Sequence, residues 1–145
     1  MRFVLIGGLA ARLHGSPTVT DDLDICHSLD AANLERLASA LNEMKARRRG
    51  VDEDLPFVID SDVLTRTTNL TLSTEFGPVD PLAHPPGVSG FDELAANAIE
   101  ESIDEIRVRV ASLEDLIRMK LASGRPKDLI EAEVLGALRD EIEGR

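Results

Sequence analysis

A glycine pair that ends a short apolar run, followed by an alternating acidic segment, constrains this chain most. The run ends at Gly7 and Gly8, and Asp22 and Asp24 lie in the segment 20–25. In an extended strand alternate residues point to the same face, so the two carboxylates project side by side. They repel each other unless a cation lies between them. Mg²⁺ takes oxygen ligands and keeps sites open for water and phosphate, so the block predicts a site for a nucleotide polyphosphate.

The length of 145 residues suffices for one domain, 1–145, with a sheet core over 1–111 and C-terminal helices over 112–145. No apolar run approaches the roughly 18–20 residues of a membrane span, and the start of the chain has no signal-peptide pattern. Cys26, the single cysteine, cannot form an internal disulfide. These features predict a cytoplasmic protein without a membrane partner.

The net charge of −11 argues against broad affinity for nucleic acid but leaves room for a local basic groove. Two clusters of basic residues could form one. The first is Lys45 with Arg47, Arg48 and Arg49, and the second is Arg118, Lys120, Arg125 and Lys127.

Hydrophobic periodicity and the positions of glycine and proline predict an α/β fold with a mixed twisted sheet flanked by helices. Strands are expected at 2–6, 20–27, 57–59, 69–74, 79–82 and 106–111. Helices are expected at 9–13, 30–47, 91–102, 112–124 and 127–143, the last two as a C-terminal pair.

A third carboxylate, Asp80, begins a predicted strand just after a Gly-Pro turn. A strand next to that of Asp22 and Asp24 would place it beside the pair. Three carboxylates and two metal ions about 3.5–4 Å apart suit in-line phosphoryl chemistry. The third acid then assists the second metal or acts as a base on the attacking hydroxyl.

Three blocks of the sequence together resemble the nucleotidyltransferase superfamily. They are GGLAARLHGSPTVTDDLDI at 7–25, GPVDPL at 77–82 and SLEDLIRMKLASGRPKDL at 112–129. The pattern is most similar to the AbiEii-type branch, which includes nucleotidyltransferase toxins of toxin–antitoxin systems. The resemblance spans roughly residues 3–135. It implies a minimal nucleotidyltransferase fold and transfer of a nucleoside monophosphate from an NTP to an acceptor hydroxyl.

The resemblance also implies roles for ten residues. Gly7 and Gly8 form the nucleotide-facing turn, and Ser16 neighbours the phosphates. Asp22 and Asp24 bind Mg²⁺ or Mn²⁺, with Asp80 as the third acid. Lys120 contacts the triphosphate, and Arg125, Lys127 and Asp128 match the run that follows it. A lysine ammonium near phosphate oxygens offsets negative charge in the transition state.

The sequence departs from its relatives in two places. Thr18 stands where relatives often carry a basic residue, which weakens the expected grip on phosphate. The chain also starts almost directly on its first strand, without a preceding helix. That indicates a minimal member, a truncated chain, or an apolar sheet edge that a partner covers.

The acceptor and the partner stay open at this stage. An RNA such as tRNA, or a protein, fits the toxin branch, with a cognate antitoxin or a second copy as partner. The chain has four Phe and no Trp or Tyr for base stacking, so RNA would be held through phosphates. Arg47–Arg49 could serve there, although such a run also fits a basic helix C-terminus. The alternatives are an aminoglycoside-type small-molecule enzyme and a non-catalytic antitoxin or regulatory partner.

We interpret three further residues as structural. His14 suits the turn before Gly15. Cys26 and His27 match no usual zinc spacing, and Cys26 is expected to pack as a buried thiol.

Overall fold

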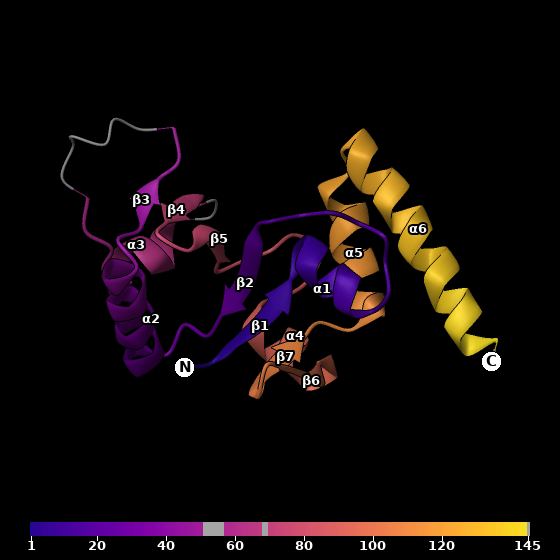
Figure 1. Ribbon diagram of the computed structural model, residues 1–145, viewed down its shortest axis with the longest axis horizontal. Coiled ribbons are helices and arrows are strands. Elements are labelled where there is room, and N and C mark those ends of the chain that lie inside the picture. Colours follow the sequence, from indigo (N-terminus) through magenta and orange to yellow (C-terminus); the bar gives the residue numbers. More distant parts are fainter. Residues whose placement is uncertain (51–56, 68–69, 145) are drawn as a thin grey trace.

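The computed structural model describes residues 1–50, 57–67 and 70–144. Seven strands of the described residues form one open, twisted mixed sheet in the order β3-β4-β5-β2-β1-β7-β6 (Figure 1). The strands are β1 Phe3–Ile6, β2 Leu23–His27, β3 Arg47–Arg48, β4 Leu72–Thr74, β5 Gly77–Leu82, β6 Ile99–Ile103 and β7 Ile106–Val110. The helices are α1 Gly7–Leu13, α2 Ala31–Glu43, α3 Ser61–Arg66, α4 Phe91–Asn97, α5 Leu113–Ser123 and α6 Pro126–Glu143.

The apolar first strand lies inside the sheet. It pairs antiparallel with β2, with Ile6 opposite Asp24, and parallel with β7, with Leu5 opposite Val110. The alternative of an apolar sheet edge that a partner covers does not hold for this strand, because β2 and β7 flank it. The sheet ends instead at β3 and β6.

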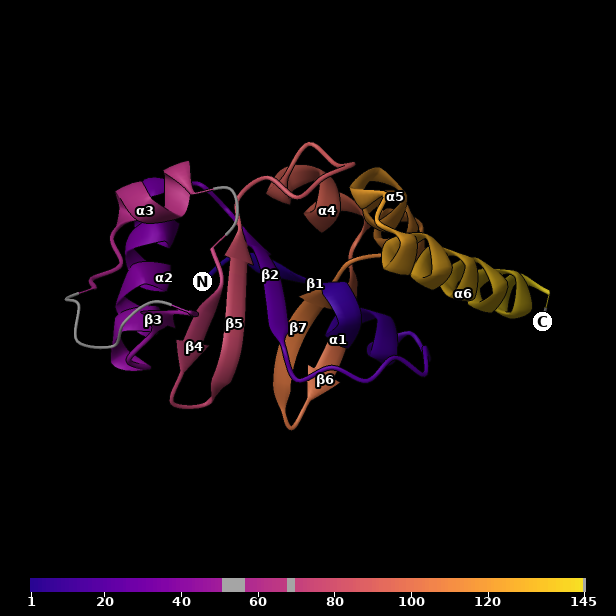
Figure 2. The same ribbon diagram turned by 90° about the horizontal axis from the view of Figure 1, so that it is seen from above.

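Four of the six helices of the described residues gather at the two ends of the sheet, whereas α1 and α4 contact its inner strand β1. Helices α2 and α3 lie beside the β3–β5 strands, whereas α5 and α6 pack against each other at the opposite side (Figures 1 and 2). Helix α6 runs outward, and the C-terminus marks that end of the molecule (Figure 2). None of the helices formed by the described residues is long and apolar enough to cross a membrane.

The predicted C-terminal helical pair is present, and local capping defines its boundaries. The Ser112 hydroxyl accepts a hydrogen bond of 3.1 Å from the backbone N–H of Asp115 at the start of α5. Gly124 ends α5 with a φ of 68°, a left-handed conformation that favours glycine. Pro126 then opens α6, where its missing N–H is harmless.

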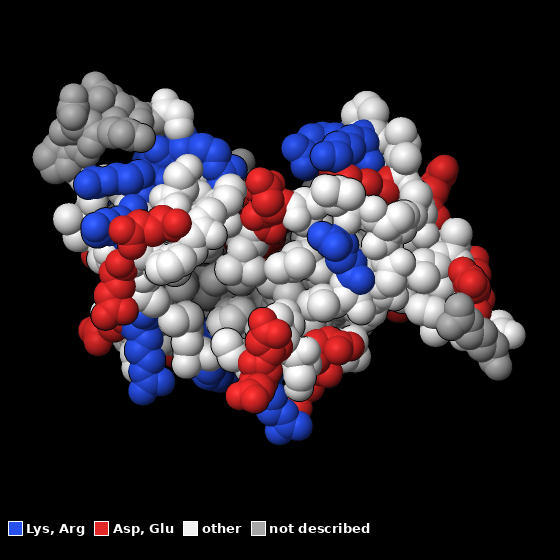
Figure 3. Space-filling model, in the orientation of Figure 1, with Lys and Arg blue, Asp and Glu red and all other residues white. Residues whose placement is uncertain are grey.

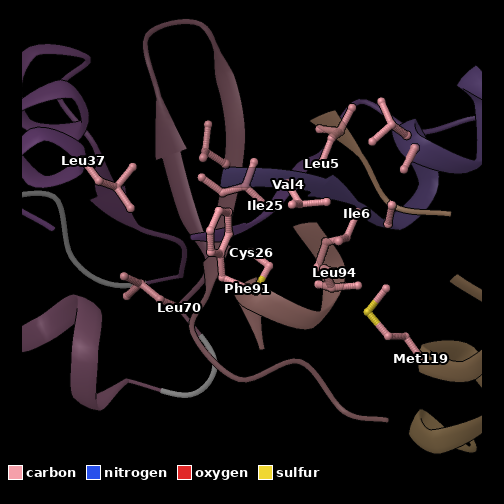
Figure 4. Packing of buried hydrophobic residues seen from close by; sticks show 14 of the residues in the cluster. Val4, Leu5, Ile6, Ile25, Cys26, Leu37, Leu70, Phe91, Leu94 and Met119 are labelled. Atoms are coloured by element: carbon pink, nitrogen blue, oxygen red, sulfur yellow. The ribbon is translucent and has the colours of Figure 1, made fainter. Parts of the chain in front are cut away.

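The core joins the central strands to the flanking helices. Val4, Leu5 and Cys26 of β1 and β2 are buried at its centre. Leu37 of α2 lies on one side of these strands and Met119 of α5 on the other (Figure 4). This packing fixes the strand ends that carry the predicted acidic residues relative to the C-terminal helices.

Three element predictions are wrong. The helix expected at 91–102 ends at Asn97, and β6 follows it and pairs with β7. No strand forms at 57–59, and the unpredicted helix α3 follows, capped by Asp60. The helix expected to reach residue 47 ends at Glu43, because Lys45 takes a φ of 55° and turns the chain. Arg47–Arg48 is therefore a short edge strand, not a helix C-terminus.

Candidate active site

Two of the predicted acids lie side by side because of strand register. Strands β2 and β5 run parallel, and Asp24 is the direct partner of Asp80 in this pairing. Neighbouring strands lie about 4.8 Å apart, so their side chains on the same face are close. The juxtaposition predicted for Asp80 is therefore confirmed, although its chemical role remains a prediction.

The Asp24 carboxyl group is surrounded by negative charge. Burial raises its pKa most, followed by the charges of Asp80 and Asp22 and a hydrogen bond to Asp80, while Lys120 opposes the rise. The resulting pKa is about 6, against an ordinary value of 3.8. Asp22 lies just before β2 and is partly exposed. Of the cations in the described residues, none forms an ion pair with Asp22 or Asp24.

Gly7 and Gly8 bring the start of α1 against this acidic group. Gly7 has a φ of 72°, and a Cβ atom there would overlap with Oδ2 of Asp24. A Cβ atom on Gly8 would lie 2.8 Å from Cγ2 of Thr20. The glycines are therefore required for close packing onto the acidic segment. The nucleotide-facing role that the resemblance implies for them remains a prediction.

Ser16 is buried and bonds within its own loop. Its Oγ lies 2.8 Å from Oγ1 of Thr18 and accepts a hydrogen bond of 3.3 Å from the Thr18 backbone N–H. Thr18 thus fixes the loop at the position where the resemblance leads us to expect a basic residue. Nothing in these contacts tests the expected proximity of Ser16 to phosphate.

A cavity of about 150 Å³ lies between the ends of β1 and β5 and the helices α5 and α6. Apolar side chains such as Met119 and Leu135 form part of its lining. Five of the ten predicted site residues also line it, namely Gly7, Asp24, Lys120, Arg125 and Asp128. The other five, Gly8, Ser16, Asp22, Asp80 and Lys127, do not.

A network of ion pairs holds Lys120 at this cavity. Its Nζ lies 3.5 Å from Oδ1 of Asp128 and also pairs with Glu131. Asp128 is only 2% exposed and accepts a hydrogen bond of 2.7 Å from Nε of Arg125. That bond is the main cause of a pKa of Asp128 below its ordinary value, and Lys120 adds to the effect. Asp128 therefore anchors the two cations and joins α5 to α6. Lys127 is 85% exposed.

Arg49 is a site residue that sequence reasoning assigned only to a general basic run. Its Nη2 donates a hydrogen bond of 2.7 Å to Oδ1 of Asp80. The two residues are 31 positions apart, so no local spacing rule identifies the pair. The only signal in the sequence is the Arg47–Arg49 run itself.

The surface view places these charges around a notch. Acidic side chains lie in the notch between the β3–β4 side and the α5–α6 side, and basic side chains cover both rims (Figure 3). Strands β2 and β5, which carry Asp24 and Asp80, lie between those two sides (Figure 1). An acidic floor between basic rims suits a triphosphate and its metal ion.

The carboxylates suit a metal ion that arrives with its substrate. In the part of the chain that the structure describes, no three His, Cys, Asp or Glu side chains form a group able to hold a metal ion. Mg²⁺ often binds through one or two carboxylates while phosphates and waters supply the other ligands. Asp22 and Asp24, close together and without a paired cation, fit this mode.

The remaining candidates have structural contacts. The His14 Nε2 lies 2.7 Å from the backbone oxygen of Ala111. The buried Nε2 of His27 lies 3.3 Å from the backbone oxygen of Leu64. Burial raises the pKa of the Cys26 thiol to about 12, which keeps it protonated and unreactive.

Comparisons with known proteins bear on the fold. No family model matches the chain, and no curated protein matches it. The solved structure of the lincosamide antibiotic adenylyltransferase LnuA, with lincomycin bound, is similar with a TM-score of 0.55 and 16% sequence identity. That alignment covers 94% of this chain and 86% of LnuA.

The solution structure of the antibiotic-resistance factor ANT(2'')-Ia is similar as well. Its TM-score is 0.51 and its sequence identity is 18%, over 99% of this chain and 83% of the other. At these identities the likeness concerns the fold. The predicted AbiEii-type branch is not confirmed by either structure. The described chain has a mixed α/β fold of the nucleotidyltransferase type.

Proposed function

We propose that this chain transfers a nucleoside monophosphate from an NTP to an acceptor hydroxyl group and releases pyrophosphate. The observation that carries the proposal is the pairing of Asp24 with Asp80 beside a cavity that Asp24 and Lys120 line. Asp24 and Lys120 at the cavity, with Asp80 paired to Asp24 beside it, are the kinds of group that phosphoryl transfer requires. The fold shared with LnuA, named as an adenylyltransferase, supports the same chemistry.

The reaction assigns one task to each of these groups. The acceptor oxygen attacks the α-phosphorus, and the bond from the α-phosphorus to the oxygen bridging to the β-phosphorus breaks. Asp80 accepts the proton of the acceptor hydroxyl. Asp22 and Asp24 would hold Mg²⁺ or Mn²⁺, and the ion would supply positive charge against the triphosphate. Lys120 offsets the charge of the leaving pyrophosphate.

The other predicted residues support this arrangement. Gly7 and Gly8 allow the turn to approach Asp24 and Thr20, and Ser16 orders the loop beside that turn. Asp128 holds Lys120 in place, while Arg125 and Lys127 supply positive charge at the same rim.

An RNA such as tRNA, or a protein, is the first candidate acceptor, in a toxin–antitoxin setting. The observation that favours RNA is the exposed basic strand β3, Arg47–Arg48, next to Arg49 and thus to Asp80. Arginine side chains at an edge can hold a phosphate backbone without reading its sequence. In this setting a cognate antitoxin would mask the site.

A small antibiotic is the second candidate acceptor. The structures of LnuA with lincomycin and of the resistance factor ANT(2'')-Ia favour it. A net charge of −11 also suits an aminoglycoside-like cation.

One assay tests the reaction and separates the acceptors. The protein is incubated with each α-labelled NTP and Mg²⁺, together with total RNA, a protein extract, lincosamides or aminoglycosides. We expect transfer to one class, and a loss of at least about 1,000-fold in Asp22→Ala and Asp24→Ala with unchanged circular dichroism. Asp62→Ala, which removes an exposed acid on α3, is the matched control.

Two results would contradict the proposal. Full activity of Asp22→Ala or Asp24→Ala would show that the substituted acid takes no part in the reaction. Tight NTP binding without turnover on any acceptor would support the non-catalytic alternative.

A further inference from the structure

Arg49 is held firmly against the third acid. Its Nη2 donates to Oδ1 of Asp80 at 2.7 Å and to the backbone oxygen of Leu72 at 2.8 Å. Its own backbone N–H donates to the oxygen of Thr71 at 3.0 Å. The guanidinium is thus tied to β4 by the Leu72 backbone oxygen and to β5 by the Asp80 carboxylate. It is 36% exposed, whereas the Asp80 side chain is 15% exposed.

Arg49 already supplies one cation to the Asp80 carboxylate. On one side Asp80 faces Asp24 across the β2–β5 pairing, and Arg49 binds one of its oxygens. A guanidinium carries a permanent positive charge and cannot lose its proton. It therefore supplies charge to Asp80 without any metal.

We propose that Arg49 takes the place of a second metal ion at Asp80, so that the chain binds a single divalent ion, at Asp22 and Asp24. This rests on the proposed function, because it assumes that the acids bind a metal together with an NTP. It also decides the role of the third acid. Asp80 acts as the base on the acceptor hydroxyl, positioned by Arg49, and not as a ligand of a second ion.

Neighbouring Arg48 provides a matched control. It lies on β3 next to Arg49, but its guanidinium stands 5.2 Å from the centre of the Phe57 ring and not at Asp80. Replacing it removes the same charge from the same surface and leaves Asp80 paired. A difference between the two variants therefore reports on the Asp80 contact and not on overall charge.

The test counts Mn²⁺ ions by electron paramagnetic resonance in the full chain with a non-hydrolysable NTP analogue. We expect about one ion for the wild type and for Arg48→Ala, and about two for Arg49→Ala. Arg49→Gln removes the charge but keeps a hydrogen-bond donor for the Leu72 oxygen, and we expect about two ions for this variant as well. It provides a second test in case Arg49→Ala fails to fold. In Arg49→Gln combined with Asp80→Asn the count should return to about one.

Other ion counts would contradict either the role of Arg49 or the proposed function. About two ions in the wild type, or about one in both Arg49 variants, would overturn the role of Arg49 and leave the proposed reaction standing. Absence of bound Mn²⁺ from every form would overturn the metal-dependent function itself.

Discussion

Two groups of charged side chains meet at the cavity between β1, β5, α5 and α6, and they are balanced in opposite ways. Asp22, Asp24 and Asp80 come together with one ion-paired cation, Arg49, among the described residues. At the α5–α6 junction, Asp128 and Glu131 are instead paired with three cations, Lys120, Arg125 and Lys127. The pKa of Asp24 is accordingly raised, whereas that of Asp128 is lowered.

This difference in charge balance indicates that the two groups contribute differently to the stability of the folded chain. A carboxylate whose charge is already neutralised by neighbouring side chains stabilises the folded chain. A carboxylate crowded by other acids destabilises it until a cation binds. The acidic group therefore fits a ligand site, and the paired group fits a support that holds Lys120 in position.

The largest expected effect is on the paired group. Asp128→Ala removes a buried carboxylate that two cations share, and we expect a loss of about 3 kcal/mol of unfolding free energy. Urea denaturation measures it. Asp80→Ala is the comparison, and its loss should be smaller because that pair is more exposed. Equal losses for the two variants would remove the distinction between the groups.

Gly7→Ala should come next. The new methyl group would overlap with Oδ2 of Asp24, so we expect transfer activity to fall about 100-fold, equivalent to about 2.7 kcal/mol. Gly50→Ala is the control, since Gly50 has a similar φ of 80° with nothing within 4 Å. Gly50→Ala should lower stability through backbone strain but leave transfer activity unchanged. Similar activity in both variants would mean that Asp24 accommodates the methyl group.

Asp24→Asn should stabilise the metal-free protein. The folded pKa of Asp24, about 6, lies above the ordinary 3.8, so the folded chain binds more protons between these values. Wild-type stability therefore falls as pH rises from about 4 to about 6, and the asparagine variant escapes this loss. Allowing for partial exposure, we expect a gain of about 1–2 kcal/mol at about pH 7.5.

Unfolding in EDTA at about pH 4 and about pH 7.5 checks that prediction. The gain should vanish at the lower pH, where the wild-type carboxyl is protonated. Mg²⁺ with an NTP should narrow the gap at the higher pH by stabilising the wild type. If Asp24→Asn were more stable than the wild type by the same amount at both pH values, the gain in stability would not come from the ionisation of Asp24.

Lys127→Ala should have the smallest effect. Its side chain is 85% exposed and 3.8 Å from Glu131, so we expect no measurable change in the urea midpoint. The KM for the NTP tests its predicted phosphate contact, and a rise of a few fold is expected at low salt. Arg139→Ala, which removes a charge paired elsewhere on α6, is the control.

The sequence predicted the elements with strong local signals. The cap at Ser112 and the stop at Gly124 marked α5, and the alternation around Asp24 marked β2. Strand β6 was missed because Glu100 and Glu101 favour a helix as readily as a strand. Its turn to β7 also uses Asp104 and Glu105 at positive φ, without the glycine that usually signals a hairpin.

The site was predictable where one block held its residues together. The spacing of Asp22 and Asp24 predicted a pair on one strand, but β2 begins only at Leu23, so Asp22 lies just before it. Asp80 could be placed beside Asp24 once a neighbouring strand was assumed, and the register confirms that position. The contact of Arg49 with Asp80 depends on where the edge strand β3 joins β4. No periodicity carries that information, because sheet order is set by packing over long sequence distances.

Strand register gives the acidic pair an unusual tolerance to change elsewhere. Asp24 and Asp80 face each other through backbone hydrogen bonds between β2 and β5, so the loops between these two strands can vary in length without moving the acids apart. A single residue inserted in β5 before position 80 has the opposite effect, since it turns the acid to the other face of the sheet. The acidic pair is thus protected against insertions in the loops and vulnerable to a one-residue slip in a strand.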